Sequence, residues 1–257
     1  MPEGDTVFRT ARRLREGLAG QVVTRFDIRV PGSATADLTG ETVHDVVPRG
    51  KHLLLRAGDL TLHSHLKMEG HWDLYRPGDR WRAPAFRARA IVGTARAEAV
   101  GFDLAMLEVL PTADEDRVVG HLGPDPLAAD WDPAEAARRL ASDGRAVHVA
   151  LLDQRNVAGF GNEYVNELLF VRGILPTTPA SSVDTAGLVE TGARMIQLNR
   201  DRQGRTFTGD ARPGRQTWVY RRDGRPCRRC GTLIRKTELG ASVTAERIVF
   251  WCPRCQT

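Results

Sequence analysis

Four cysteines near the C-terminal end constrain the fold of this chain more than any other feature. They form two C-x2-C pairs separated by 21 residues, Cys227 with Cys230 and Cys252 with Cys255. Two such pairs can present four thiolates tetrahedrally to Zn²⁺ at about 2.3 Å. The spacing therefore predicts one structural zinc ion, which folds the segment and does no chemistry, because four thiolates leave no open coordination position.

Disulfide bonds and a thioredoxin-like redox pair are the competing uses of these cysteines. Nothing in the sequence resembles a signal peptide, and no apolar run approaches the roughly 20 residues that span a bilayer. We therefore expect a cytoplasmic protein without a membrane segment. In that compartment the paired spacing favours zinc over disulfides, and the presence of two pairs argues against a single redox motif.

The charge of the chain is divided unevenly. Residues 194–257 carry 15 Lys and Arg against 5 Asp and Glu, whereas residues 1–193 carry 22 against 27. A basic C-terminal part favours a polyanionic partner, and nearly all of its cations are arginines, whose planar guanidinium suits phosphate. The alternative is a solvated basic surface that only improves solubility.

The segment between the cysteine pairs is expected to form a β-hairpin. Ile248 and Phe250 show the two-residue spacing of a strand, and the stretch 232–234 would supply the other strand. Six cations surround this hairpin: Arg228, Arg229, Arg235, Lys236, Arg247 and Arg254. A finger of this kind is suited to contact the phosphates of a nucleic acid.

Apolar periodicity and turn residues predict an α+β chain. Strands in a sandwich or barrel are expected over residues 21–30, 51–56, 60–66 and 87–92. A loop-like acidic stretch follows Pro111. Helices are expected over residues 133–141, 147–154, 162–171 and about 185–198. From Trp218 the chain returns to strands and turns around the cysteines.

The opening, MPEGDT, has two interpretations. In the first, a helix runs to a stop at Gly20, and Pro2 and Glu3 merely suit its first turn. The apolar residues of that helix share one face: Val7, Ala11, Leu14 and Leu18. In the second, removal of Met1 leaves Pro2 as a free secondary amine beside the carboxyl group of Glu3. The opening alone favours the first interpretation, and the rest of the chain favours the second.

A further motif, LLDQRNVAGFGNEYVNELLF, covers residues 151–170. It predicts a helix that ends near Arg155, a Gly-Phe-Gly turn, and a new helix from about Asn162. Asn162 is of the type that caps helix N-termini, so the backbone N–H groups at the positive end of the helix dipole would donate to a phosphate oxygen there. The alternative is a purely structural helical hairpin.

Together these segments resemble the formamidopyrimidine-DNA glycosylase/endonuclease VIII family of DNA repair enzymes. The motifs that carry the resemblance occur in the family's order: PEGDT at 2–6, RGKHLLL at 49–55, QRNVAGFGNEYVNELLF at 154–170, WVYRRDGRPC at 218–227 and the cysteine hairpin. The PEG opening is closer to the endonuclease VIII branch, and the whole pattern looks most like the actinobacterial proteins of that branch.

The resemblance implies a fold and a domain order. An N-terminal catalytic β-sandwich with an N-terminal helix would cover residues 1–112, followed by a linker over 113–132. A helix–two-turns–helix DNA-binding region would cover 133–217, and a β-hairpin zinc finger 218–257. The resemblance also implies a monomer that acts on damaged double-stranded DNA in the bacterial nucleoid.

The resemblance assigns chemistry to three residues. Pro2, freed of Met1, would attack the deoxyribose C1′ and form a Schiff base. An α-amino group, with a pKa of about 7.7–8.0, is far less protonated at neutral pH than a lysine, with a pKa of about 10.4. Glu3 would protonate the sugar ring oxygen as a general acid. Lys51 matches the family's β-hairpin lysine, which contacts phosphate and takes part in proton transfer.

The resemblance also assigns DNA contacts to four residues. Asn162 and Arg247 match the residues that grip the phosphates around the flipped nucleotide, and Arg247 is also assigned to the later elimination. Tyr220 would add a hydroxyl group to the backbone contacts. Met68 aligns with the wedge that fills the space left by the flipped base, although outside the family context it would suit a core equally well.

The chain departs from the formamidopyrimidine branch in two places. The stretch GFDLAML at 101–107 lacks the Arg–Phe pair that supplements the wedge there, which argues against a preference for 8-oxoguanine opposite cytosine. The gap between the cysteine pairs is longer than usual near residues 241–246, just ahead of Arg247. His63 and His65 match no family role and are interpreted as structural.

We therefore expect a bifunctional DNA glycosylase and abasic-site lyase of base excision repair. It would remove oxidised bases, chiefly pyrimidines, and cleave the strand by β,δ-elimination. One alternative is an enzyme of the same class that acts mainly on abasic sites. The other alternative is a non-catalytic zinc-finger DNA-binding protein, but that interpretation does not explain why Pro2, Glu3 and Lys51 occur together.

Overall fold

The computed structural model describes residues 2–240, 242 and 246–257. They fold into two compact units: unit 1 extends to His121, and unit 2 begins at Leu122. None of the helices in these ranges combines the length and the apolar character needed to cross a membrane.

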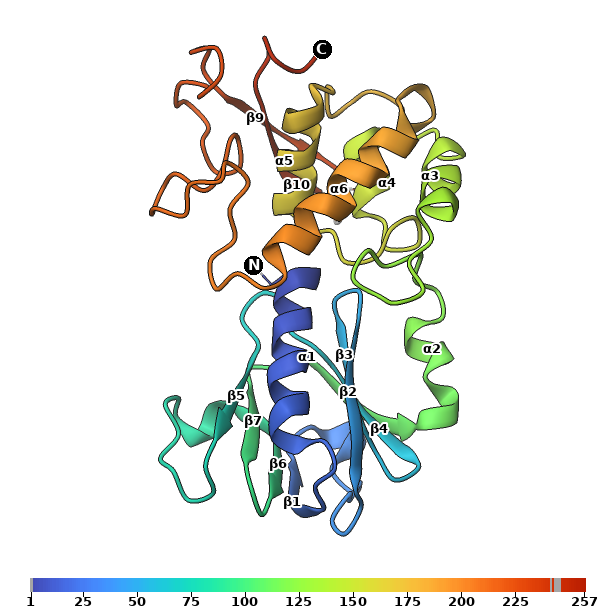
Figure 1. The fold of residues 1–257 in the computed structure, drawn as a ribbon, viewed down its shortest axis with the longest axis vertical. Coiled ribbons are helices and arrows are strands. Elements are labelled where there is room, and N and C mark those ends of the chain that lie inside the picture. Colours follow the sequence, from blue (N-terminus) through green and yellow to red (C-terminus); the bar gives the residue numbers. More distant parts are fainter. Residues whose placement is uncertain (1, 241, 243–245) are drawn as a thin grey trace. The chain divides into compact units, whose positions relative to one another are not determined.

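Unit 1 contains two four-stranded antiparallel sheets, one with the order β1-β6-β7-β5 and the other with the order β2-β3-β4-β8 (Figure 1). The strands are β1 (Val23–Ile28), β2 (Val43–Arg49), β3 (His52–Ala57), β4 (Leu60–His65), β5 (His71–Tyr75), β6 (Ala88–Thr94), β7 (Glu98–Phe102) and β8 (Met106–Pro111). Short helical turns complete the unit: Pro31–Ser33, Ala85–Arg87, Thr112–Asp114 and α2 (Asp116–Val119). The predicted α+β class with an N-terminal sandwich is confirmed.

Helix α1 (Gly4–Leu18) contributes its apolar face to the core of unit 1, together with side chains from both sheets. The predicted face is confirmed, because four residues spaced along it are buried: Val7, Ala11, Leu14 and Leu18. Full burial of one such leucine is worth about 1.5–3 kcal/mol. The helix begins at Gly4 with Glu3 as its N-cap, so Pro2 lies before the helix and not in its first turn. The first-turn explanation of Pro2 is therefore wrong.

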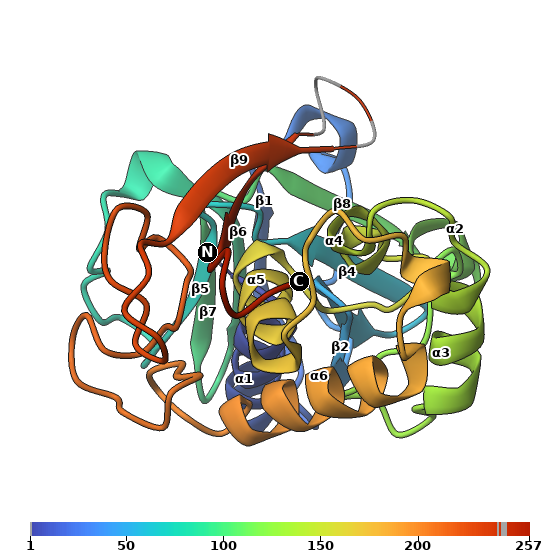
Figure 2. The ribbon, with the colours of Figure 1, turned by 90° about the horizontal axis from the view of Figure 1, so that it is seen from above.

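Unit 2 is built from four helices and a two-stranded hairpin. The helices are α3 (Pro133–Ala141), α4 (Val147–Leu152), α5 (Asn162–Arg172) and α6 (Thr185–Asn199), with a short turn at Ala180–Ser182. All four predicted helices are confirmed with small shifts at their ends, and α5 and α6 lie side by side (Figure 2). A buried aromatic and aliphatic cluster around Tyr164 and Leu168 forms the helical core.

The hairpin consists of β9 (Arg235–Leu239) and β10 (Arg247–Trp251), paired antiparallel. The predicted hairpin between the cysteine pairs is therefore confirmed, although its first strand starts at Arg235 and not at residue 232. The predicted alternation on the second strand is wrong, because Ile248 is exposed while Val249 and Phe250 are both buried. The packing of β10 against α5 accounts for the burial of Phe250, which joins a cluster with Phe170 of α5.

Candidate functional site

Pro2 and Glu3 lie immediately before α1. The carbonyl oxygen of Glu3 accepts the backbone N–H groups of Thr6 and Val7 at 2.9 and 3.1 Å, which starts the helix. The side chain of Glu3 is fully buried. Glutamate is almost never fully buried without a specific role or partner. The chain thus holds a carboxyl group out of solvent beside its second residue.

Lys51 lies in a two-residue turn between β2 and β3. The register pairs Arg49 with His52 across this turn, and Gly50 has φ of +58°, a conformation that glycine adopts at little cost. The turn is the tightest kind that can join two antiparallel strands. Lys51 therefore sits at the tip of a short, well-paired hairpin.

Met68 follows β4 in an exposed turn, and its side chain is 61% exposed. The core interpretation of Met68 is therefore wrong. Because His52 pairs with His65 across β3 and β4, the hairpin tip that carries Lys51 and the turn that carries Met68 lie at the same end of the sheet.

The N-terminal end of α1 lies at that end as well. Just past the other end of the helix, the backbone N–H of Gly20 donates to the carbonyl oxygen of Val43, the first residue of β2, at 2.8 Å. A 15-residue helix and a seven-residue strand are of similar length, about 22 Å each. Unit 1 therefore brings four of the predicted site residues to one end: Pro2, Glu3, Lys51 and Met68.

Three histidines on β3 and β4 form a cluster next to the Lys51 hairpin. His52 Nδ1 lies 2.8 Å from His63 Nε2, and His63 Nδ1 lies 2.9 Å from a carboxylate oxygen of Glu108 on β8. The ring of His65 meets that of His52 edge-on at 5.0 Å, and His121 approaches the same ring at 6.3 Å.

Burial lowers the pKa of His52 to about 3, and the neighbouring imidazoles and Lys67 add to the effect. Burial, Lys67 and Lys51 lower the pKa of His65 to about 4. Both rings are therefore neutral at pH 7. Sequence reasoning interpreted His63 and His65 as structural but missed His52 and Glu108, which only the cross-strand register brings together.

Asn162 is the first residue of α5, and its side chain is engaged within unit 2. The N-cap is Gly161, so the prediction that Asn162 caps the helix is wrong. Its side-chain oxygen accepts from Nε2 of His148 at 3.0 Å, and its Nδ2 donates to the carbonyl oxygen of Ile248 at 2.8 Å. Burial lowers the pKa of His148 to about 4.

These contacts join α5 to the strand that carries Arg247. Asn166, one turn after Asn162, accepts the backbone N–H of Phe250 at 2.6 Å, which adds a second attachment to β10. Arg247 itself is exposed, and its guanidinium donates to the carbonyl oxygen of Glu246 at 2.8 Å. Asn162 and Arg247 are thus brought close together. The lengthened gap expected at 241–246 falls mostly on 241 and 243–245, which lie outside the described residues.

Glu167 is a buried position that the sequence analysis did not single out. Its fully buried carboxylate accepts three consecutive backbone N–H groups, those of Trp218, Val219 and Tyr220, at 2.7, 2.9 and 2.8 Å. Burial raises the pKa of Glu167 to about 7, while the three N–H donors favour its charged form. Glu167 thereby fixes the WVY segment, whose Tyr220 ring packs edge-on against Phe250 at 5.5 Å.

The four cysteines meet in one cluster. Sγ of Cys230 lies 3.4 Å from Sγ of Cys252, and Sγ of Cys227 lies 4.0 Å from that of Cys255, with all four sulfurs within 4.8 Å of one another. Four thiolates bound tetrahedrally at about 2.3 Å lie roughly 3.8 Å apart, so the donor set fits a single metal ion.

Gln256 supports this cluster from the end of the chain. Its side-chain oxygen accepts the N–H of Cys252 at 2.9 Å, and its amide donates to the carbonyl oxygen of Ile174 just after α5 at 3.0 Å. The N–H of Thr257 donates to the carbonyl oxygen of Gly173 at 3.2 Å. The final residues thus connect the cysteine cluster to the end of α5.

The cations around the hairpin have different environments. Arg229 lies over the ring of Phe170 at 4.5 Å, Lys236 pairs with Asp223 at 2.9 Å, and Arg228 donates to backbone carbonyl groups.

The GFDLAML stretch lies in unit 1. Its one charged residue, Asp103, has φ of +50° and pairs with Arg87, so the carboxylate is engaged locally.

Comparison with known proteins identifies both units. A model described as the formamidopyrimidine-DNA glycosylase N-terminal domain matches residues 1–123, and one described as the H2TH domain of the same glycosylase matches residues 122–197. The chain is 52% identical to the DNA-(apurinic or apyrimidinic site) lyase Nei2 of Mycolicibacterium smegmatis, over all of this chain and 99% of that protein. It is 51% identical to endonuclease 8 2 of Mycobacterium tuberculosis, over all of both chains.

Solved structures agree with these relatives. A structure of MutM in complex with DNA containing carbocyclic 8-oxo-G is similar with a TM-score of 0.82 at 26% identity, over all of both chains. A complex of Lactococcus lactis Fpg with DNA containing an abasic site is similar with a TM-score of 0.81 at 25% identity, again over all of both chains. The chain therefore belongs to the formamidopyrimidine-DNA glycosylase/endonuclease VIII family of DNA repair enzymes.

Proposed function

We propose that the protein removes oxidised bases, chiefly pyrimidines, from duplex DNA and then cleaves the strand at the resulting abasic site. The observation that carries this proposal is the placement of Pro2, Glu3, Lys51 and Met68 at one end of unit 1. The name of the similar M. smegmatis protein, an abasic-site lyase, supports the second step. The complex of the similar L. lactis protein with abasic-site DNA supports the substrate class.

Pro2 is the proposed nucleophile once Met1 has been removed. The lone pair of its nitrogen forms a bond to C1′ of the extruded nucleotide, and the electron pair of the C1′–base bond leaves with the base. The nitrogen then loses its proton and Glu3 protonates the ring oxygen, so that the nitrogen lone pair forms the C1′=N bond of an iminium ion as the C1′–O4′ bond breaks. A buried carboxyl group beside the amine suits this role, since little water competes for its proton.

Strand cleavage follows from the iminium ion. It acidifies the C2′ proton, and the electron pair of that C–H bond expels the 3′ phosphate (β-elimination). A second proton loss at C4′ expels the 5′ phosphate (δ-elimination). Lys51, at the hairpin tip, is proposed to contact a phosphate near the lesion and to assist proton transfer, and Arg247 is proposed to assist the later elimination. Met68 would fill the space left by the flipped base.

Unit 2 is proposed to hold the backbone that flanks the flipped nucleotide. Asn162 and Arg247, which lie close together, would contact two phosphates, and Tyr220 would add a hydroxyl group. We propose that one Zn²⁺ ion is bound by Cys227, Cys230, Cys252 and Cys255 and keeps the hairpin in shape. Four thiolate ligands leave the ion no open position, so its contribution is structural.

Reductive trapping tests the nucleophile. Borohydride added to the protein and an abasic-site duplex should capture a covalent complex, and Pro2→Gly should lower its yield by more than about tenfold. The sequence contains only three lysines, Lys51, Lys67 and Lys236, so few other amines compete. Lys236→Arg, which keeps the charge near the hairpin, is the matched control and should trap normally. Undiminished trapping by Pro2→Gly, or activity from chains that retain Met1, would rule out this nucleophile.

An enzyme that acts mainly on existing abasic sites is the second candidate, and the name of the M. smegmatis relative favours it. A panel of duplexes that carry an oxidised pyrimidine, 8-oxoguanine or an abasic site separates the two candidates. Base release from the oxidised pyrimidine at a rate comparable to abasic-site scission supports the glycosylase proposal. Scission of the abasic duplex without base release from any lesion supports the lyase alone.

A further inference from the structure

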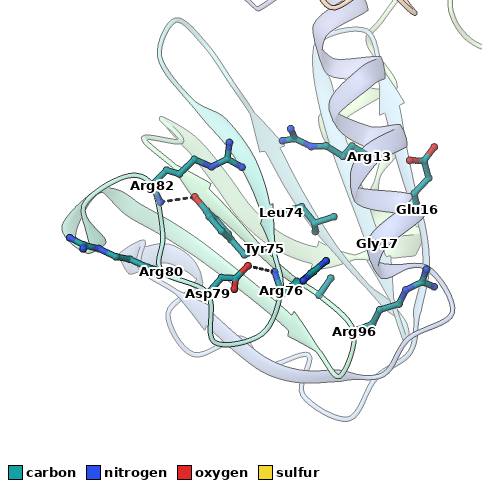
Figure 3. Close-up of a pocket in the computed structure, with 11 residues that line it drawn as sticks. Arg13, Glu16, Gly17, Leu74, Tyr75, Arg76, Asp79, Arg80, Arg82 and Arg96 are labelled. Atoms are coloured by element: carbon teal, nitrogen blue, oxygen red, sulfur yellow. Dashed lines mark hydrogen bonds between the residues drawn. The ribbon is translucent and has the colours of Figure 1, made fainter.

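Unit 1 contains an open cavity of about 790 Å³ between α1, the end of β5 and the loop that follows it (Figure 3). Gly17, which lines the cavity, is 14 residues along the chain from Glu3, or about 20 Å along the helix. The cavity therefore lies toward the opposite end of unit 1 from the proposed catalytic residues. Five arginines line it: Arg13, Arg76, Arg80, Arg82 and Arg96.

Two of these arginines are braced by the protein. Asp73 lies 3.8 Å from the Arg13 guanidinium and 3.9 Å from that of Arg82. The Arg82 guanidinium also lies over the ring of Tyr75, 5.6 Å from its centroid, and the Tyr75 hydroxyl accepts the backbone N–H of Arg82 at 3.1 Å. These contacts pre-organise one wall of the cavity.

The other three arginines are available to a ligand. Among the described residues, the guanidinium groups of Arg76, Arg80 and Arg96 make no hydrogen bond or ion pair. Elsewhere in unit 1, arginines are regularly paired with carboxylates, as in Arg25–Glu98, Arg29–Asp27, Arg56–Glu115 and Arg87–Asp103. Three unpaired guanidinium groups around one cavity leave an excess of positive charge that suits an anionic ligand.

The apolar and acidic residues that line the rest of the cavity indicate which class of anion it could bind. Leu74, Ala97 and Gly17 give the cavity an apolar part, and two carboxylates, Glu16 and Asp79, interrupt the ring of arginines. The volume is within the range of about 300–1,000 Å³ of ordinary ligand pockets. A nucleic-acid backbone carries a phosphate at every nucleotide and would leave the apolar part unused, whereas a peptide can place apolar side chains there.

We propose that this cavity docks an acidic segment of a partner protein, in which carboxylate side chains are interspersed with apolar ones. The carboxylates pair with Arg76, Arg80 and Arg96, and an apolar side chain covers Leu74 and Ala97. Charge complementarity of this kind sets specificity and the association rate. The site lies away from the proposed catalytic end, so a bound partner leaves Pro2 and Lys51 accessible.

Fluorescence anisotropy with a labelled peptide of sequence EDLEDLED tests the proposal. The wild-type protein should bind it saturably, and the triple variant Arg76→Ala, Arg80→Ala, Arg96→Ala should raise the Kd by more than about tenfold. The matched control is Arg89→Ala, which removes an exposed arginine outside the cavity and should leave the Kd unchanged. Abasic-site cleavage should be unchanged in the triple variant, whose altered side chains are exposed, and a normal melting temperature confirms its fold.

Two comparison ligands define the outcomes. The neutral peptide QNLQNLQN should bind at least about tenfold more weakly than EDLEDLED, because its side chains carry no charge. An unlabelled octathymidylate should not displace the acidic peptide at equal concentration. The proposal is overturned if the acidic peptide fails to bind, if the triple variant binds it normally, or if the octathymidylate competes equally and loses affinity in the same variant. The last outcome would make the cavity a nucleic-acid contact.

Discussion

His52 and His63 share a hydrogen bond across β3 and β4, with 2.8 Å between Nδ1 of the first ring and Nε2 of the second. The carboxylate of Glu108 accepts from Nδ1 of His63, so Nε2 of His63 is the acceptor for the proton on His52 Nδ1. One carboxylate thus orders two imidazoles in sequence. This series of hydrogen bonds ends at His52, the residue that follows Lys51.

Acid should destabilise the protein through these rings. The folded pKa values of about 3 for His52 and about 4 for His65 are below the unfolded value of about 6.5. Between pH 6.5 and 4 the unfolded chain therefore binds protons that the folded chain does not, and the free energy of unfolding falls as pH falls. At pH 5 we expect a loss of up to about 2 kcal/mol per ring relative to pH 7.

Urea denaturation at pH 7 and pH 5 measures this effect as a difference between variants. Glu167, whose folded pKa of about 7 is raised, contributes with the opposite sign between about pH 4.5 and 7, so the wild-type slope alone is not diagnostic. His52→Gln combined with His65→Gln should flatten the acid-side loss, and His44→Gln, at an exposed position, should not. Equal pH slopes in all three proteins would contradict the assignment.

Replacing Glu167 by glutamine should destabilise unit 2. One carboxylate oxygen accepts two N–H groups and the other accepts one, whereas an amide has a single acceptor oxygen. At least one buried N–H of the WVY segment would lose its partner, at a cost of about 1–3 kcal/mol. Thermal unfolding should show a lower melting temperature, while Glu190→Gln, at an exposed position on α6, should melt like the wild type. An unchanged melting temperature for Glu167→Gln would refute the role.

Removing the metal should disorder the hairpin. Elemental analysis of the purified protein should give one zinc per chain, and a strong chelator should lower both the melting temperature and the affinity for DNA. Zinc binding in zinc-finger peptides is worth about 10–16 kcal/mol, which is more than a small hairpin can replace. Added Zn²⁺ should restore both properties, and added Mg²⁺ should not. A protein that melts identically with and without chelator would contradict a structural ion.

Met68→Ala should impair activity on duplex DNA selectively. Since the side chain is 61% exposed, its loss should change stability by less than about 0.5 kcal/mol. Without the wedge, extrusion of a base from a stacked duplex becomes more costly, and we expect at least a tenfold lower rate of base release, about 1.4 kcal/mol. Cleavage of a single-stranded abasic site should change little. Phe86→Ala, at a position 79% exposed, is the control. Equal losses on both substrates would argue against a wedge.

Local periodicity made much of this fold predictable. The buried face of α1, the four helices of unit 2 and the cysteine hairpin depend on spacings within short segments. Four strands were missed: β2, β5, β7 and β8. β2 contains Pro48, which is tolerated because β2 is an edge strand of its sheet, and this position is set by pairing and not by local sequence.

The candidate site was predictable only where a motif carried it. Pro2, Glu3 and Lys51 belong to recognisable sequence motifs. Their common position at one end of unit 1, however, follows from the register of β2, β3 and β4 and from the contacts of α1 with β2. Glu167 reads as an ordinary helical glutamate, because its three N–H partners lie about 50 residues further along the chain. Contacts of this kind, between segments far apart in the sequence, cannot be predicted from amino-acid composition or from hydrophobic periodicity.

The hydrogen bonds of Gln256 and Thr257 have a practical consequence for anyone who produces the protein. Residues of a tag fused directly after Thr257 would continue from a backbone already bonded to Gly173, one residue from the side chain that supports Cys252. A tag at the other end would block the amine proposed for catalysis. A tag on either side is therefore better removed by a protease before activity or metal content is measured.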